Sequence, residues 1–185
     1  MAKKKKQSLA ALYIILIAIA ATIFLVRHFH IKNFHIIEPD VLYTSGQPRG
    51  MDYTRLLYRY HIATIINLRS QAEHRERNWY NEEITWVRRN GVKYFEMPLG
   101  KNPNSPSQFP DANMQEQFLT IMASKECIPV LIHDSSGEAR AAMLTSVWLR
   151  KVRGYSVEDT IRLVEELKGR PATMAEKNFI EQLAN

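Results

Sequence analysis

The strongest chemical feature of the sequence is an apolar, strand-like segment that leads through a short turn into a predicted helix. The strand covers residues 128–133 and ends in His133; the turn contains Gly137, and Arg140 opens the helix. Backbone N–H groups of such a turn lack carbonyl partners, converge on one concavity and gain from the helix dipole. Gly137 permits a tight backbone, and Arg140 can bind two phosphate oxygens. The pattern predicts an oxyanion cradle, although an ordinary strand–turn–helix unit with a surface arginine fits the same residues.

The segments around this turn alternate between strand and helix. Strands are predicted at residues 41–44, 63–68, 92–97 and 128–133, and helices at 51–60, 79–90, 111–123, 140–153, 156–168 and 173–183. This order predicts an α/β domain with a mainly parallel sheet flanked by helices. Asp111 is the expected N-cap of its helix. The lone cysteine, Cys127, enters a buried strand and is expected to be a packing residue and not a nucleophile.

The turn resembles the His-Cys-x5-Arg signature loop of tyrosine and dual-specificity phosphatases, except that Asp134 stands at the second position. Residues 42–48, 65–69 and 129–133 also resemble small bacterial dual-specificity-like phosphatases, so the resemblance covers about residues 36–183. It implies the cysteine-dependent phosphatase fold and the hydrolysis of phosphate monoesters, without a cofactor or a metal site. The implied phosphate loop comprises His133, Ser135, Ser136, Gly137, Glu138, Ala139 and Arg140.

Asp134 occupies the position of the nucleophile in that family, where a cysteine thiolate accepts the phosphoryl group. A carboxylate here is itself an anion and could take the N–H groups and Arg140 in place of substrate. At about 4 Å, two like charges repel by roughly 1 to 4 kcal/mol, so phosphate binding should weaken. Ala141 also departs from the Ser or Thr that many family members carry. Asp111, the acid nearest the preceding loop, is the candidate general acid, although an N-cap role fits it better.

Other residues near the turn are expected to have lesser roles. The resemblance implies that His133 orients the loop through hydrogen bonds, which is a structural role. Arg49, Arg69 and Lys101 could flank the site, but we expect each of them to be a solvated surface charge.

Three hypotheses about function follow from Asp134. The chain is a degenerate phosphatase that binds a partner or a phosphate group, or an active phosphatase whose natural residue 134 is cysteine and which is seen here as a variant. In the third, the enzyme uses the Asp134 carboxylate directly, as enzymes that form aspartyl phosphates do with a metal ion beside the acid. A phosphorylated protein or a small phosphate ester is the expected ligand.

The excess positive charge of the chain lies at its N-terminus. The net charge is +6, and residues 1–32 contain six basic residues and no acidic one, so the remaining 19 basic and 19 acidic residues balance. A neutral folded part argues against nucleic-acid binding.

An uncharged run of 18 residues, 9–26, covers as a helix most of a roughly 30 Å hydrocarbon layer. We expect it to be a transmembrane anchor; a cleaved signal peptide is the alternative, because Ala18-Ile19-Ala20 suits a protease. The expected organisation is a basic cytoplasmic leader at 1–8, the anchor at 9–26, a tether at 27–35 and a phosphatase-like domain at 36–185. By the positive-inside rule the domain faces outward, into the periplasm of a bacterium.

Overall fold

The computed structural model describes residues 11–22, 30–75, 78–100 and 108–183. The chain divides into two units, residues 1–30 and residues 31–185. In the first unit, residues 11–22 form a helix with exposed side chains.

The predicted membrane anchor is not supported by this helix. Among the residues that the structure describes, no helix is both long enough and apolar enough to cross a membrane. The expectations of a single-pass anchor over 9–26 and of an outward-facing domain are therefore wrong, and the described residues give no support to the expected membrane contact. Residues 9–10 and 23–26 of the predicted span lie outside the described residues.

A mixed five-stranded sheet forms the centre of the second unit, in the order β1-β2-β5-β3-β4. Its strands are β1 (His35–Glu38), β2 (Leu42–Ser45), β3 (Thr64–Asn67), β4 (Lys93–Glu96) and β5 (Val130–His133). Strands β2, β5, β3 and β4 run parallel, as the alternation of strands and helices predicts, whereas β1 pairs with β2 in the antiparallel direction. The antiparallel edge strand makes the sheet mixed rather than wholly parallel, and the sequence had not indicated it.

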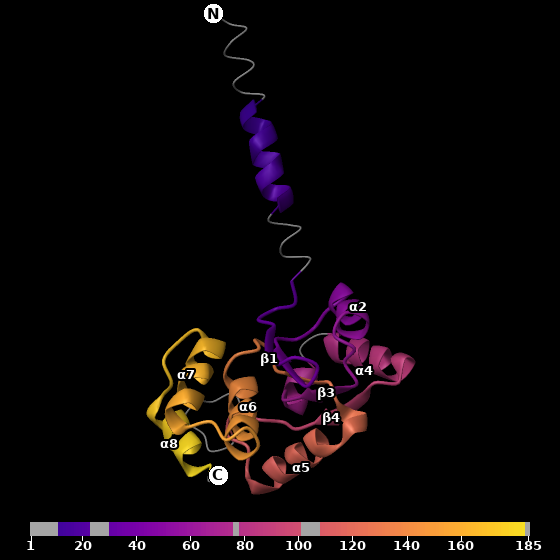
Figure 1. Ribbon diagram of the computed structural model, residues 1–185. Coiled ribbons are helices and arrows are strands. Elements are labelled where there is room, and N and C mark those ends of the chain that lie inside the picture. Colours follow the sequence, from indigo (N-terminus) through magenta and orange to yellow (C-terminus); the bar gives the residue numbers. More distant parts are fainter. Residues whose placement is uncertain (1–10, 23–29, 76–77, 101–107, 184–185) are drawn as a thin grey trace, which may run out of the picture. The chain divides into compact units, whose positions relative to one another are not determined.

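Helices cover both faces of this sheet (Figure 1). They are α2 (Met51–Tyr58), α3 (Gln71–His74), α4 (Trp79–Asn90), α5 (Ala112–Ala123), α6 (Ala139–Lys151), α7 (Val157–Lys168) and α8 (Met174–Gln182), with a 3₁₀ turn η2 at Lys125–Cys127. Successive strand residues point to opposite faces, so Leu131 packs in the cluster with α2 and α4, while Ile132 packs in the cluster with α5 and α6. A third cluster joins α6 to α7 and α8. Cys127 is buried in the core, as predicted.

Local capping explains where several helices begin and end. Asp111, Ser156 and Thr173 each accept a hydrogen bond from a first-turn N–H of the helix that follows. Gly91 and Gly169 end α4 and α7 in the left-handed conformation. These signals are local, and the predicted bounds of these helices are therefore close to the observed ones.

Candidate anion-binding site

The turn between β5 and α6 lies where three parallel strands end together. His133 at the end of β5 is paired with Ser45 of β2 on one side and with Asn67 of β3 on the other. Carboxyl ends of neighbouring parallel strands are the common place for ligand sites in α/β folds. Gly137 has φ of +79°, and a Cβ on it would lie 2.2 Å from the Gly46 nitrogen. Only glycine fits at that position, as the sequence predicted.

The Asp134 carboxylate fills the concavity of the turn from within. Its Oδ1 accepts hydrogen bonds from the backbone N–H groups of Ser136 and Gly137, both at 2.7 Å. Its Oδ2 accepts from Ala141 N–H at 3.2 Å and lies 3.8 Å from Arg140 Nε. The side chain is buried. The N–H groups expected to hold an oxyanion therefore hold the chain's own carboxylate.

Arg140 is held from its other side by Glu73, a buried residue of α3. Nη1 and Nη2 of Arg140 donate to the two carboxylate oxygens of Glu73, at 2.7 and 3.3 Å. Nη1 also donates to the carbonyls of Leu68 and Leu99, and Nη2 donates to Ser135 Oγ at 3.1 Å. The two-pronged ion pair fixes the plane of the guanidinium. Sequence reasoning missed Glu73, although its spacing from Ser70 is that of a capping box, which the structure contains.

Arg69 is buried, which corrects the expectation of a surface charge. Its Nε donates to Glu73 Oε1 at 3.2 Å, and its Nη1 donates to Gln47 Oε1 at 3.1 Å. The guanidinium carbon lies 3.8 Å from the ring centre of Trp79. Arg49 is exposed as expected, and Lys101 lies outside the described residues.

His133 and Glu83 form a fully buried pair beside the turn. His133 Nε2 lies 3.1 Å from Glu83 Oε1, close enough for an ion pair, although the ring N–H is not aimed well enough for a hydrogen bond. Gln47 Nε2 donates to Glu83 at 3.1 Å, and Tyr94 Oη at 2.8 Å. Burial raises the pKa of Glu83, but the His133 charge and these hydrogen bonds outweigh burial, so the pKa lies below its ordinary value.

Two tyrosine hydroxyls support the Glu83 carboxylate. Burial, and then the charge of Glu83, raises the pKa of both Tyr53 and Tyr94 well above the ordinary value. Both hydroxyls therefore stay protonated near neutral pH and remain hydrogen-bond donors. Tyr94 also accepts a hydrogen bond from Asn67 Nδ2 at 2.8 Å.

These contacts join seven buried side chains in a row whose two ends, His133 and Asp134, are neighbours in sequence; we call this set the cradle ring. Its members, in spatial order, are Asp134, Arg140, Glu73, Arg69, Gln47, Glu83 and His133. Two arginines and three carboxylates belong to this ring, and the amide of Gln47 bridges Glu83 and Arg69. The arginines of the ring therefore already have carboxylate partners within it, without any external anion.

A family model described as the tyrosine phosphatase family matches residues 29–185. This chain belongs to the tyrosine phosphatase family. It is 21% identical over 122 residues to the tyrosine-protein phosphatase-like protein OCA2 of Saccharomyces cerevisiae, a match that covers 65% of this chain and 57% of that relative. The chain thus spans little more than half the length of OCA2.

Solved structures share the fold of this tyrosine phosphatase-family chain. The core catalytic domain of the PP-IP phosphatase SIW14 from S. cerevisiae, in complex with citrate, has a TM-score of 0.65 and 22% identity, covering 82% of this chain and 85% of that one. TpbA of P. aeruginosa in complex with pTyr has a TM-score of 0.59 and 18% identity, covering 83% and 85%. Identities this low speak for the fold, and they confirm the α/β architecture.

Asp111, the candidate general acid, caps α5. Its Oδ1 accepts a hydrogen bond from Met114 N–H at 2.8 Å, and its backbone is extended, as an N-cap requires. Within the described part of the chain, the contacts of this side chain stay in its own helix turn. The structure thus brings His133, Asp134 and Arg140 together and gives Asp111 a local task. The general-acid role stays a prediction.

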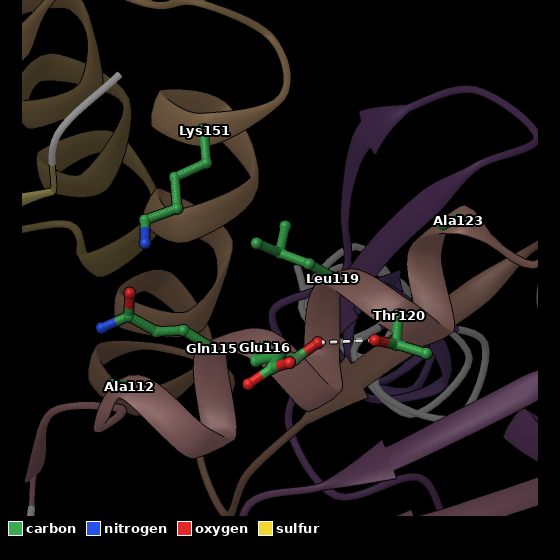
Figure 2. A pocket seen from close by; sticks show the side chains of 7 residues that line it. All are labelled: Ala112, Gln115, Glu116, Leu119, Thr120, Ala123 and Lys151. Atoms are coloured by element: carbon green, nitrogen blue, oxygen red, sulfur yellow. Dashed lines mark hydrogen bonds between the residues drawn. The ribbon is translucent and has the colours of Figure 1, made fainter.

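A separate hollow lies between α5 and the C-terminal end of α6 (Figure 2). It measures about 400 Å³ and is lined by Ala112, Gln115, Glu116, Leu119, Thr120, Ala123 and Lys151. None of these residues belongs to the cradle ring. Among the described residues, no group of three or more His, Cys, Asp and Glu side chains is arranged to hold a metal ion.

Proposed function

We propose that this chain is a non-hydrolysing member of the tyrosine phosphatase family, which binds but does not turn over phosphate esters. The Asp134 carboxylate stands in for a substrate phosphate group. The observation that carries the proposal is the set of three backbone N–H groups, of Ser136, Gly137 and Ala141, that the carboxylate oxygens accept.

A second argument comes from geometry and chemistry together. A nucleophile must attack the phosphorus atom while the cradle holds the phosphate oxygens. In this chain both oxygens of Asp134 take up cradle N–H groups, so the same donors would have to serve nucleophile and substrate at once. This arrangement disfavours direct attack by Asp134 and supports binding without turnover.

Charge balance supports the same conclusion. A phosphate monoester brings up to two negative charges to a site, and its binding needs uncompensated positive charge. The cradle ring has none to spare, because Asp134 and Glu73 both face Arg140. An incoming phosphate must displace Asp134 from the turn before it can reach the N–H groups. We therefore expect weak phosphate binding by the unsubstituted chain and stronger binding once the carboxylate is removed.

The class of ligand is inferred from related proteins. SIW14 is described as a PP-IP phosphatase, and TpbA was crystallised with pTyr, so both proteins bind phosphate-containing ligands. We infer that the cradle of this chain, when opened, takes a phosphate ester or a similar oxyanion.

The test compares three residues at position 134 with an aryl phosphate as substrate and tungstate as a phosphate-like ligand. The unsubstituted chain should show no turnover and only weak tungstate binding. Asp134→Ser, whose hydroxyl is uncharged and a far weaker nucleophile than a thiolate, should bind tungstate more tightly and without turnover. Asp134→Cys should bind tungstate and hydrolyse the aryl phosphate, because a thiolate then occupies the cradle. Turnover by the unsubstituted chain that disappears in Asp134→Asn would instead establish aspartyl catalysis and overturn the proposal.

The natural codon at position 134 provides an independent check. An Asp codon is expected. A Cys codon would show that the natural protein is an active phosphatase, and the proposal would then fail.

A further inference from the structure

Glu83 is a buried carboxylate that joins four separate elements beside the turn. It receives hydrogen bonds from Gln47 after β2 at 3.1 Å, from Tyr53 of α2 at 3.5 Å and from Tyr94 of β4 at 2.8 Å. His133 of β5 lies against it at 3.1 Å. A helix residue that is fully buried and charged costs stability unless such partners surround it. The concentration of donors at Glu83 calls for an explanation beyond packing.

His133 depends on Glu83 for its orientation. Neither ring nitrogen of His133 makes a well-directed hydrogen bond with any residue in the part of the chain that the structure describes. The imidazole is completely buried, so water does not compete for it. The attraction of the Glu83 carboxylate is therefore the polar interaction that sets the rotation of the ring.

The same carboxylate is connected to the other end of the turn. Gln47 donates to Glu83 with its Nε2 and accepts from Arg69 with its Oε1, which fixes the direction of its amide. Arg69 in turn donates to Glu73, and Glu73 holds Arg140. Both ends of the turn, His133 before it and Arg140 after it, are thus tied to one chain of buried contacts.

We propose that Glu83 is a positioning residue of the oxyanion cradle: it holds His133 behind the turn and, through Gln47, steadies the ion pair that orients Arg140. It touches no ligand itself. Its effect is to keep the N–H groups and the guanidinium converged on the point that a phosphate-type oxyanion occupies. The inference rests on the proposed function to the extent that removing the Asp134 carboxylate must open the cradle to such an anion.

Tungstate binding to the folded Asp134→Ser chain, measured by titration calorimetry, tests this with and without Glu83→Gln. Gln has the same shape but lacks the charge that holds His133. We expect tungstate binding to weaken about tenfold. A simple charge effect points the other way, because removing a negative charge near an anion site favours the anion. Glu82→Gln, the same change at the exposed neighbouring residue, is the matched control and should leave the affinity unchanged within twofold.

A second readout needs no variant that binds tungstate. Nitrogen-15 NMR of the imidazole at pH 7 reports the surroundings of the His133 ring, and Glu83→Gln should shift these signals while Glu82→Gln does not. Unchanged or tighter tungstate binding in Glu83→Gln overturns the inference. His133 signals that stay unchanged in Glu83→Gln overturn it as well, and Glu83→Asp, which keeps the charge but shortens the side chain, gives the same two readouts if Glu83→Gln fails to fold. If Asp134→Ser binds no tungstate, the proposed function fails, and the imidazole signals still decide the role of Glu83.

Discussion

This domain contains two systems of buried charged side chains, which are similarly inaccessible to solvent but differ in their capacity to bind a ligand. One is the cradle ring; the other is the ion pair of Lys168 and Glu176, which joins α7 to α8 and has both side chains fully buried. Glu176 also accepts the N–H of Thr173 at 2.7 Å, and Lys168 donates to the carbonyl of Pro171. Burial raises the pKa of Glu176, but the hydrogen bonds from Lys168 and Thr173 and the charge of Lys168 lower it by more, so the net shift is downward.

The difference lies in how far apart in sequence the partners are and what else converges on them. Lys168 and Glu176 are eight residues apart and satisfy each other within one helix–turn–helix. The cradle ring draws its members from the ends of β2, β3 and β5 and from α3, α4 and α6, and backbone N–H groups point at Asp134. Buried charge alone therefore does not identify a ligand site. Convergence of donors at the ends of parallel strands does.

The largest expected effect comes from breaking the C-terminal pair. Lys168→Met keeps the length of the side chain but leaves Glu176 buried without its cation. We expect a loss of about 3–5 kcal/mol in the free energy of unfolding. Because this pair faces no ligand, tungstate should not restore the lost stability. Chemical denaturation with and without tungstate measures the loss of stability and any recovery of it. If tungstate restores the stability of Lys168→Met, the proposed difference between the two systems is wrong.

Asp134→Asn should cost less and behave differently. Loss of the carboxylate leaves Arg140 with one anionic partner and points an amide at N–H donors. We therefore expect the free energy of unfolding to fall by about 2–3 kcal/mol. Tungstate should then bind the folded state and recover stability in proportion to its concentration. The same denaturation series as for Lys168→Met is the measurement. An Asp134→Asn chain that tungstate does not stabilise would contradict an anion cradle.

Local signals in the sequence predicted a large part of the fold. The helix at 79–90 was predicted with its observed bounds, because apolar spacing and Gly91 both mark it. The capping box from Thr173 to Glu176 lies at the start of another predicted helix. The turn from His133 to Arg140 and the capacity of Asp134 to occupy its own cradle were also predicted, since all these residues are contiguous.

The remainder of the cradle ring depended on information that is not local. Gln47 and Glu83 are 36 residues apart, and Glu73 and Arg140 are 67 apart. Their meeting depends on β5 lying between β2 and β3, an order that hydrophobic periodicity does not specify. Arg69 was expected at the surface because most arginines are there. The short helix α3, which carries Glu73, has only four residues and left too weak a pattern to predict.

A third carboxylate, Asp111, can be assigned to one of the two systems by its role. As an N-cap it resembles Thr173 of the C-terminal system; as a general acid it would belong with the cradle. Asn caps helices as well as Asp does but cannot donate a proton as an acid.

The structure favours the cap, so Asp111→Ala should lower the free energy of unfolding by about 1 kcal/mol and Asp111→Asn should leave it unchanged. In the Asp134→Cys chain, Asp111→Asn should keep kcat for an aryl phosphate within twofold. If Asp111 is the general acid, Asp111→Asn should instead lower kcat about a hundredfold or more and remove the alkaline limb of the pH–rate profile. Such a fall in kcat would assign Asp111 to the chemistry of the cradle. It would also show that the hydrogen bond from Met114 N–H to Asp111 opens during turnover, because a carboxyl group that caps a helix cannot protonate a leaving group at the same time.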